Sequence, residues 1–551
     1  MRPLSFSLAL LPSAVLFATD HVTPAHPSPR ADADFVAMMV PHHQAAIDMA
    51  RVELRDGTNP VLRRMAEEII VTQQQEIRAM QIAVGASDSA AARLDKGVTS
   101  PNAISHHDRV YAAEQFSNTV SVTDPADNRL LGVIRLGDPL PGNLSPLYRG
   151  QVLVHGLGFS PDHRTIAAVS IGSNSVTFID TRTNAIKHVT YVGRSPHEAF
   201  FTPDGNEVWV TVRGENYIAV LDGHTYAEKT RITVPNGPGM QIFSPDGKYG
   251  YVCSSFTPET VVITVADHRI VGHIVQASPF CPNIAASPDG NQVWLTLKDV
   301  GKVMVFQAKP PFAVIKTLDT GPITNHVNFG MNNGSTLAYV TVGGTNEVQV
   351  YRTNDFAKIA TIPVGSLPHG LWPSGDGSRM YVGLENDDKL VAIDVATNHV
   401  VASVPIGQAP QAVNYVPNAV PDGDGMQGLE PLGAARSATH LNLAAPGSKS
   451  PSAPTSVSLF DQGLVQVLQA AVTGLTPGQS YVFALSSKAD GSGDVEPLAQ
   501  FVANAAGAAI VSAVGPLRQL AHTNASTARR YLVIRAGTSA QPAAVAQLQT
   551  P

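Results

Sequence analysis

The chain repeats one pattern of apolar strands and polar turns between residues 105 and 417. Each repeat opens with an apolar strand, which in three repeats runs into a Pro-Asp-Gly turn, as in PHEAFFTPDG and PNIAASPDG. A Tyr/Trp-Val strand, a turn with Asn or Asp and two further alternating strands follow. Ser-Pro-Asp-Gly fits a type I turn, in which Pro takes the second position and Gly closes the turn. Four short strands in about 40–45 residues is the period of a β-propeller blade.

The ends of the repeat region indicate that the propeller closes on itself. Residues 109–137 contain strands two to four of a blade but lack the innermost strand, and residues 411–417 form an innermost strand with nothing after it. Joined, the two segments complete a seventh blade and remove the open edges of an unclosed sheet. The seven innermost strands begin 42 to 44 residues apart, at His155, His197, Gly239, Pro282, His326, His369 and Gln411.

The repeat sequences are similar to a known family. Segments such as ALAYVTVGGTNEVQVY and RMYVGLENDDKLVAIDVATNHVVASVPIG resemble the repeat of the YVTN family of β-propellers, and the resemblance covers about 310 residues. Several YVTN-like propellers are hydrolytic lactonases or subunits of quinoprotein dehydrogenases, but their active residues do not map cleanly onto this sequence. A propeller fold alone does not name a function.

Histidines are concentrated at the first position of the innermost strands. His155, His197, His326 and His369 occupy four of these seven positions and, with Gln411, form one continuous arc around the channel mouth; Glu198 follows one of them. Two interpretations are open. Each imidazole could bond the backbone of a neighbouring blade as part of a P-H-G repeat consensus, or the arc could hold a metal ion or an anionic ligand.

Residues 31–84 differ from the repeats and predict two helices, at about 34–54 and 60–84. Asp56-Gly57 supplies a helix stop, and Asn59-Pro60 supplies an N-cap and a first-turn proline. Met and His recur at helical spacing on facing stripes of the two helices, at Met38, Met39, His42, His43, Met49, Met65 and Met80. Met stripes are often ordinary core filler. Thioether together with imidazole is also the ligand set that favours copper, Cu(I) especially.

The same segment resembles a second family. FVAMMVPHHQAAIDMA, followed by NPVLRRMAEEIIVTQQQEIRAM, is similar to domain-of-unknown-function family 305. The resemblance implies a ferritin-like helical protein, in some members exported and linked to copper binding, and places that link on the seven Met and His residues above. Many members carry a second copy of the hairpin, whereas this chain has one. Because a lone hairpin buries little surface, we expect it to form a homodimer or to pack on the next domain.

The N-terminal segment and the two cysteines predict an exported protein. Met1-Arg2 precedes an apolar run that ends at Thr19, so residues 1–19 predict a secretory signal peptide and a periplasmic or extracellular protein. The run is short and interrupted by Pro12, which makes a membrane anchor the weaker interpretation. Cys253 ends the second strand of one blade and Cys281 begins the next blade. We expect them to form a disulfide that contributes roughly 3 kcal/mol.

Composition narrows the function further. Lys and Arg number 37 against 44 Asp and Glu, and charged residues make up only 15% of the chain. This composition excludes a coiled coil and intrinsic disorder, and the net charge of −7 argues against a nucleic-acid partner. Residues 85–104 and 418–454 are expected to be linkers. Alternating runs over residues 455–549 predict a small β-sandwich with an accessory role.

We therefore expect a mainly β protein: a helical hairpin, a seven-bladed propeller and a small β-sandwich. Binding is favoured over catalysis, with copper as the expected metal in the hairpin and the propeller as a scaffold that presents its face to a small ligand or a protein partner. The alternative is a propeller enzyme, a lactonase-like hydrolase or a metal-dependent oxidoreductase, that uses the channel-mouth histidines. A purely structural surface protein, in which the Met and His residues serve only packing, is the third interpretation.

Overall fold

A computed structural model describes most of the chain in two compact units, residues 1–96 and 97–551. The described residues are 29–57, 59, 62, 66, 69, 73, 103–138, 150–332, 334–433, 438–448, 455–462, 465–515, 529–539 and 542–550. The expected signal peptide and most of the expected 85–104 linker lie outside them. Among the described helices, none has the length and apolar character needed to cross a membrane.

The first unit contains one long helix, α1 (Pro29–Asp56), which ends where the Asp56-Gly57 pair predicts. It starts five residues earlier than expected. Its single internal proline, Pro41, does not divide it. Of the second expected helix, the backbone is helical at the described residues Leu62, Ala66, Ile69 and Gln73, and the remainder of 60–84 lies outside the described residues. The hairpin is therefore shown only in part, by one complete helix.

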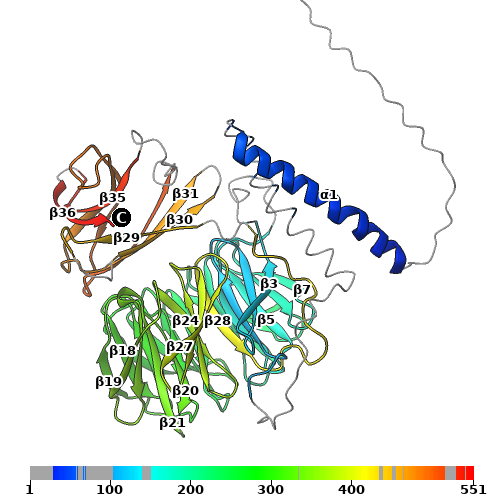
Figure 1. Cartoon of the computed structure of the whole chain (residues 1–551). Helices are drawn as coiled ribbons and strands as arrows, with labels where there is room; N and C mark the ends of the chain where they lie inside the picture. The colour runs from blue at the N-terminus through cyan, green and yellow to red at the C-terminus, as the bar shows by residue number, and fades with distance from the viewer. Residues whose placement is uncertain are drawn as a thin grey trace, which may run out of the picture. The chain divides into compact units, whose positions relative to one another are not determined.

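Residues 109–416 form a seven-bladed propeller, as the repeat pattern predicts (Figure 1). Each blade is one four-stranded antiparallel sheet, and below it is named after its innermost strand. Three blades consist of β4 (Val154–Phe159), β5 (Thr165–Ser170), β6 (Ser175–Asp180) and β7 (Ile186–Tyr191); β8 (Pro196–Phe201), β9 (Glu207–Val212), β10 (Tyr217–Asp222) and β11 (Glu228–Thr233); β12 (Pro238–Phe243), β13 (Tyr249–Ser254), β14 (Glu259–Thr264) and β15 (Ile270–Val275).

The next three blades follow in the same order. They consist of β16 (Ile284–Ala286), β17 (Gln292–Leu297), β18 (Lys302–Gln307) and β19 (Val314–Asp319); β20 (Thr324–Asn332), β21 (Ser335–Val342), β22 (Glu347–Arg352) and β23 (Lys358–Pro363), with the 3-10 turn η2 (Gly343–Thr345) between β21 and β22; β24 (Pro368–Pro373), β25 (Arg379–Leu384), β26 (Lys389–Asp394) and β27 (His399–Pro405).

The seventh blade joins the two ends of the repeat region, as predicted. Its innermost strand, β28 (Pro410–Val416), pairs with β1 (Arg109–Glu114), which continues into β2 (Thr119–Asp124) and β3 (Arg129–Arg135). Tyr111 lies opposite Asn414 in this pairing. Because β28 hydrogen-bonds to β1, the seventh blade has four strands like the others and closes the ring.

Burial explains why the blades stack. The second strand of the β8 blade, β9, is almost entirely buried, whereas its outermost strand, β11, is exposed except at Ile232. The two central strands of a blade have a neighbouring blade on both faces, so they are apolar on both sides instead of alternating. Trp209 and Trp294 have no exposed surface and fill the space between blades.

The C-terminal β-domain contains eight strands that hydrogen-bond in one continuous order. They are β29 (Thr439–Ala444), β30 (Thr455–Asp461), β31 (Gln466–Val472), β32 (Ser480–Ser486), β33 (Val495–Val502), β34 (Ala509–Gly515), β35 (Tyr531–Gly537) and β36 (Pro542–Gln549). The order β33-β32-β35-β36-β29-β30-β31-β34 makes one continuous sheet, with β33 and β34 at its two edges, so the expected β-sandwich is shown only in part.

The segment expected as a linker, residues 418–454, is more ordered than its composition predicted. It contains β29, which pairs with β30 and β36 and so belongs to the C-terminal β-domain. Glu430 forms a β-bridge with Val133 on the propeller. The prediction was wrong here because the Gly- and Pro-rich stretches on both sides conceal the short alternating run Thr439–Ala444.

The β30–β31 hairpin of the C-terminal β-domain packs on the propeller at the ends of the second strands. Phe460 stacks on Phe116, with ring centroids 4.1 Å apart. Ala471 and Ala508 share a buried cluster with Ile323 and Leu367, which enter the β20 and β24 blades. The domain predicted as an accessory module is therefore attached to the propeller face at which the innermost strands begin.

Candidate functional site

The four histidines that share one repeat position meet at the channel mouth. The ring centroids of His155 and His197 are 4.4 Å apart, those of His155 and His369 are 6.3 Å apart, and those of His326 and His369 are 4.8 Å apart. All four side chains are buried, with between 5% and 7% of each residue exposed. The arc expected from the repeat alignment is thus a compact imidazole cluster.

A recurring turn residue sets where each innermost strand begins. Asn174, in the turn after β5, has a left-handed backbone and accepts a hydrogen bond from the backbone N–H of Ser195, at 2.9 Å. Ser195 is also left-handed and lies two residues before His197. The same bond links three other blade pairs: Asn118 to Leu153, Asn346 to Leu367, and Asp388 to Ala409. At these four junctions, one blade therefore positions the entrance strand of the next blade.

The glycine after His155 allows neighbouring strands to approach closely. A Cβ atom on Gly156 would lie 2.1 Å from the carbonyl oxygen of His197 and 2.6 Å from a carboxylate oxygen of Glu198. Gly370, which follows His369, lies equally close to the carbonyl of Gln411. The glycine of the P-H-G consensus is therefore explained by packing, because a larger residue at this position would clash with the neighbouring strand.

The imidazoles are not held by the backbone of neighbouring blades. Within the described part of the chain, the Nδ1 atoms of His155, His197 and His369 are buried without a hydrogen-bond partner. Burial lowers the pKa of His155, His197 and His369 well below the usual histidine value, and it lowers the pKa of His326 to about 3. Four neutral imidazoles, three of which have an unpartnered buried nitrogen, are suited to a metal ion or a hydrogen-bonding ligand.

Glu198 adds a carboxylate to the cluster. One nitrogen of His155, one nitrogen of His197 and one oxygen of Glu198 all lie within 4.8 Å of one another. The Oε2 atom of Glu198 is buried without a partner among the described residues. Burial raises the pKa of Glu198 to about 8. The donor group at the channel mouth is therefore two imidazoles and the carboxyl of Glu198, with His326 and His369 in the same cluster.

A second ring of residues at the mouth was missed by the sequence analysis. These residues directly follow the second strand of a blade. They are Arg213 in the β8 blade, Lys298 in the β16 blade and Glu385 in the β24 blade. Arg213 lowers the pKa of His155 and His197, after the larger effect of burial, and Lys298 acts in the same way on His326. Aligning the repeats on this position, as well as on the histidines, would have revealed these charges.

Glu385 connects the mouth to the C-terminal β-domain. Its Oε2 atom lies 3.6 Å from the Nδ1 atom of His369, and its Oε1 atom accepts a hydrogen bond from the side chain of Gln469 in β31. Its neighbour Asn386 donates a hydrogen bond to the hydroxyl of Ser456, at 2.9 Å. The mouth expected to present a surface to a partner therefore faces the chain's own C-terminal β-domain.

A cavity of about 200 Å³ continues from the histidines into the channel. Glu198 and His326 line it at the mouth, and Trp372 lines it near the opposite ends of the innermost strands. Its wall is mainly apolar and receives residues from the innermost segments of all seven blades, including Leu157, Phe200, Met240, Ile284, Leu371 and Ala412. The buried polar cluster thus lies at one end of a mainly apolar cavity.

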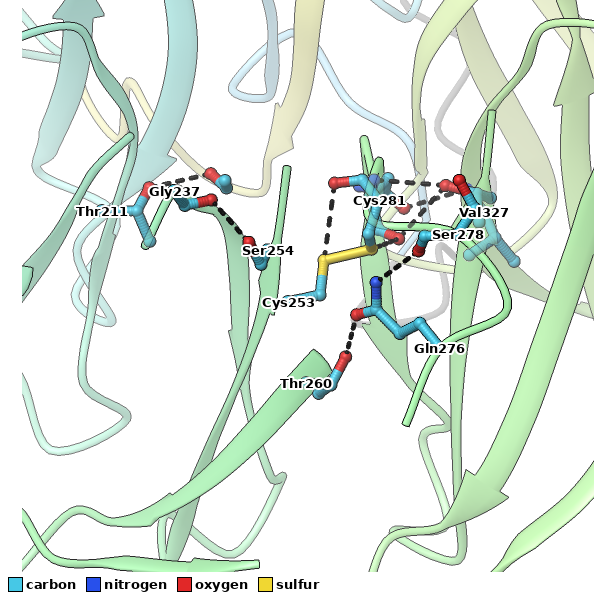
Figure 2. The surroundings of a disulfide bond; sticks show 12 residues. Thr211, Gly237, Cys253, Ser254, Thr260, Gln276, Ser278, Cys281 and Val327 are labelled. Atoms are coloured by element: carbon cyan, nitrogen blue, oxygen red, sulfur yellow. Dashed lines mark hydrogen bonds between the residues drawn. A yellow bond between two sulfur atoms is a disulfide. The ribbon is translucent and has the colours of Figure 1, made fainter. Parts of the chain in front are cut away.

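The predicted disulfide between Cys253 and Cys281 is present, on the part of the ring that carries no histidine (Figure 2). Both cysteines are fully buried, with their Cα atoms 6.0 Å apart. Cys253 takes the repeat position of Thr211, whose hydroxyl donates a hydrogen bond to the carbonyl of Gly239 in the next blade, at 2.9 Å. The disulfide therefore joins two neighbouring blades at the repeat position at which Thr211 joins another pair of blades by a hydrogen bond.

The Met and His residues of α1 lie mainly on its surface. Met38 is 69% exposed and Met49 is 68% exposed. His42 is exposed and Met39 is half-buried. His43 is buried, and its Nδ1 atom lies 2.8 Å from the carbonyl oxygen of Met39. Met65 and Met80, the expected partners on the second helix, lie outside the described residues.

Comparison with known protein families finds a match for one segment of the chain. Residues 21–84 match the family described as Domain of unknown function (DUF305). No curated protein matches the chain significantly.

Solved structures match the chain at low identity. Hydrazine synthase of Kuenenia stuttgartiensis is 22% identical over 51% of this chain and 91% of that chain, with a TM-score of 0.44. The periplasmic gluconolactonase PpgL of Pseudomonas aeruginosa is 18% identical over 56% and 99%, with a TM-score of 0.46. The dihydro-heme d1 dehydrogenase NirN is 11% identical over 83% and 76%, with a TM-score of 0.42. Similarity at this level concerns the fold alone.

Proposed function

We propose that this protein binds a divalent transition-metal ion at the channel mouth, through His155, His197 and Glu198. The observation that carries the proposal is the convergence of two imidazoles and one carboxylate whose buried polar atoms lack partners among the described residues. Leaving such atoms unpaired costs about 1–3 kcal/mol each. A metal ion would satisfy all of them at once.

The donor set favours particular metals. Two imidazoles and one carboxylate form a typical set for zinc and for non-heme iron, both of which leave coordination positions open. Burial keeps the imidazoles neutral, which is the form that binds metal. Glu198, whose pKa burial raises to about 8, would release its proton when the metal ion binds. His326 and His369 lie close enough to orient a further ligand on the ion. Hydrolysis or oxidation of a substrate at such a metal is the enzymatic alternative, because both reactions use an open coordination position.

Metal titration of the full chain tests this proposal. After removal of metal with a chelator, we expect one equivalent of Zn²⁺ to bind tightly to the wild-type chain. The variants His155→Gln, His197→Gln and Glu198→Gln should each lower the affinity by about 10-fold to 100-fold. His188→Gln, at a histidine in the outer strand β7, is the matched control and should bind as the wild type does. Equal affinity in all four variants would contradict the proposal.

We also propose that the α1 segment captures copper, and that the protein acts in an oxidising compartment outside the cytoplasm. The exposed thioethers of Met38 and Met49 and the exposed imidazole of His42 favour the copper proposal. Soft thioether ligands select Cu(I). The disulfide supports the compartment, because such bonds persist mainly in oxidising environments.

Competition with a Cu(I) chelator tests the α1 proposal. In the full chain, changing Met38, Met49 and Met80 to Leu should weaken Cu(I) binding at least tenfold. The control is a variant with three methionines of the propeller core changed to Leu: Met240, Met304 and Met380. Unchanged Cu(I) affinity in the variant changed at Met38, Met49 and Met80 would contradict copper capture by the segment 31–84.

A further inference from the structure

The cavity in the propeller channel has the size and the wall of a site for one small ring. Its volume is about 200 Å³. An engineered apolar cavity of roughly 150 Å³ is large enough to bind benzene. Phe200, Phe243 and Trp372, which come from three different blades, contribute aromatic surface to the wall. Aromatic side chains bind ring ligands through offset-stacked or edge-to-face contacts. A ligand with one ring and one small substituent therefore fits this cavity.

The amide side chains in the wall are held mainly by the protein itself. The Oδ1 atom of Asn283 accepts a hydrogen bond from the backbone N–H of Val327, at 2.9 Å. The Oδ1 atom of Asn328 accepts one from the N–H of Phe329, at 2.9 Å. The Oδ1 atom of Asn414 has no partner among the described residues, but it is buried within the wall. These amides do not determine which ligand the cavity accepts.

His326 is a polar group of the wall that a ligand can reach. It lines the cavity and is 7% exposed. In the described part of the chain, its backbone hydrogen-bonds to the hydroxyl of Thr341, whereas its imidazole has no hydrogen-bond partner. Its ring nitrogens keep exposed surface, unlike the Nδ1 atoms of the other three histidines. A neutral imidazole offers one donor and one acceptor, which suits a hydroxyl group because a hydroxyl also does both.

The wall favours an uncharged ligand. Of the described residues that line the cavity, Glu198 is the only carboxylic acid, and none is a lysine or an arginine. An anionic ligand would therefore meet a carboxyl group instead of a cation. An ammonium group would compete with the metal ion for the same carboxyl. Either charge would also lose its hydration against the apolar wall, a cost that is much smaller for a hydroxyl group.

We infer that the channel binds a small monocyclic phenol, with its hydroxyl on the imidazole of His326 and its ring among the aromatic side chains of the wall. Pro245, in the turn after β12, also lines the cavity, which therefore extends towards the propeller face opposite the histidines. The ligand enters from that face, because the C-terminal β-domain packs at the mouth. The inference goes beyond the proposed metal site, because neither His326 nor the aromatic wall is a ligand there.

Calorimetric titration of the full chain with phenol tests the inference, first after removal of metal and then with zinc. We expect phenol to bind in both forms. Benzoate and benzylamine, which carry a charge, and 1-naphthol, which exceeds the cavity, should bind more weakly by about tenfold or more. Any of the three binding as tightly as phenol would overturn the inferred ligand class. Zinc binding without phenol binding would overturn the inference and leave the metal proposal standing, whereas phenol binding without zinc binding would support the inference alone.

Variants separate the polar anchor from the wall. His326→Leu should weaken phenol binding about tenfold, because the hydroxyl loses its partner, and should leave the binding of toluene nearly unchanged. His188→Leu, at an exposed histidine of β7, is the matched control and should bind phenol as the wild type does. Equal losses for phenol and toluene in the His326 variant would overturn the role of His326.

Filling the cavity should exclude both ligands. Ala285→Leu places a larger side chain in the wall and should weaken the binding of phenol and toluene alike by about tenfold or more. Ala227→Leu, at an exposed alanine, is the control for the same change in size. Thermal unfolding shows whether each variant is folded, and Phe200→Ala, which removes one aromatic wall, gives a second test of the same surface. Unchanged phenol affinity in both wall variants would overturn the inference.

Discussion

Gln469 donates a hydrogen bond to the carboxylate of Glu385, whose other oxygen lies 3.6 Å from the Nδ1 atom of His369. The donor belongs to the C-terminal β-domain, 84 residues after its acceptor. The C-terminal β-domain therefore supplies one side chain to the polar cluster of the propeller. The stability of the propeller mouth and the attachment of this domain should depend on the same contact.

Gln469→Leu should lower the free energy of unfolding by about 1–3 kcal/mol, because it leaves a buried carboxyl with one partner fewer. Equilibrium unfolding in urea measures the loss. In the double variant with Glu385→Leu the two losses should not add, because each change removes the same bond. Additive losses would mean that the two side chains act independently.

Replacing both Cys253 and Cys281 by Ala should lower the free energy of unfolding by roughly 3–4 kcal/mol, because the cross-link closes a long loop. Cys253→Thr combined with Cys281→Ala should recover about 1 kcal/mol of this loss. The new hydroxyl would donate to the carbonyl of residue 281, as Thr211 does to Gly239. A threonine variant no more stable than the alanine variant would contradict the proposed equivalence of the two links.

Substitutions of Asn174 should separate its backbone role from its role as an acceptor. Asn174→Gly keeps the left-handed backbone but removes the bond to Ser195, and should cost about 1 kcal/mol of stability. Asn174→Ala should cost a further 1–2 kcal/mol or so, because alanine resists that backbone conformation. Asn174→Asp keeps an acceptor and should remain close to the wild type. A glycine variant as stable as the aspartate variant would show that the bond contributes nothing.

Glu114 should make the protein less stable as the pH rises. Burial raises the pKa of Glu114 from 4.5 to about 7, so the folded chain holds this proton more tightly than the unfolded chain does. The resulting stabilisation is complete below pH 4.5 and is lost between pH 4.5 and 7, by about 3 kcal/mol in total. Glu114→Gln should remove this part of the pH dependence of the unfolding free energy. An unchanged pH profile in the variant would contradict the assignment.

The propeller could be predicted from sequence because its information is local and repeated. Every blade carries the same strand and turn signals, so the closing pair β28 and β1 could be recognised although it lies at opposite ends of the repeat. The disulfide followed from the same alignment, since Cys253 and Cys281 fall at adjacent strand ends. The histidine arc followed as well, because equivalent positions of a closed repeat lie on one circle.

The charged residues at the mouth and the contact with the C-terminal β-domain could not be predicted from the repeat alignment. Arg213 and Lys298 occur at a repeat position whose other members are mainly uncharged, so single charges there do not form a pattern. The contact between Gln469 and Glu385 depends on how two domains pack, which leaves no periodic trace in the sequence. The strand β29 was missed because a short alternating run among Gly and Pro residues gives a weak signal.

X-ray absorption spectroscopy of the zinc-loaded full chain tests the central claim most directly. A site at His155, His197 and Glu198 predicts a first shell of nitrogen and oxygen only, with the outer-shell scattering of two or more imidazoles, at one zinc per chain. The spectrum should lose its imidazole features when His155 and His197 are changed to Gln. A first shell that contains sulfur, or a spectrum unchanged in that double variant, would contradict a metal centre at the propeller mouth.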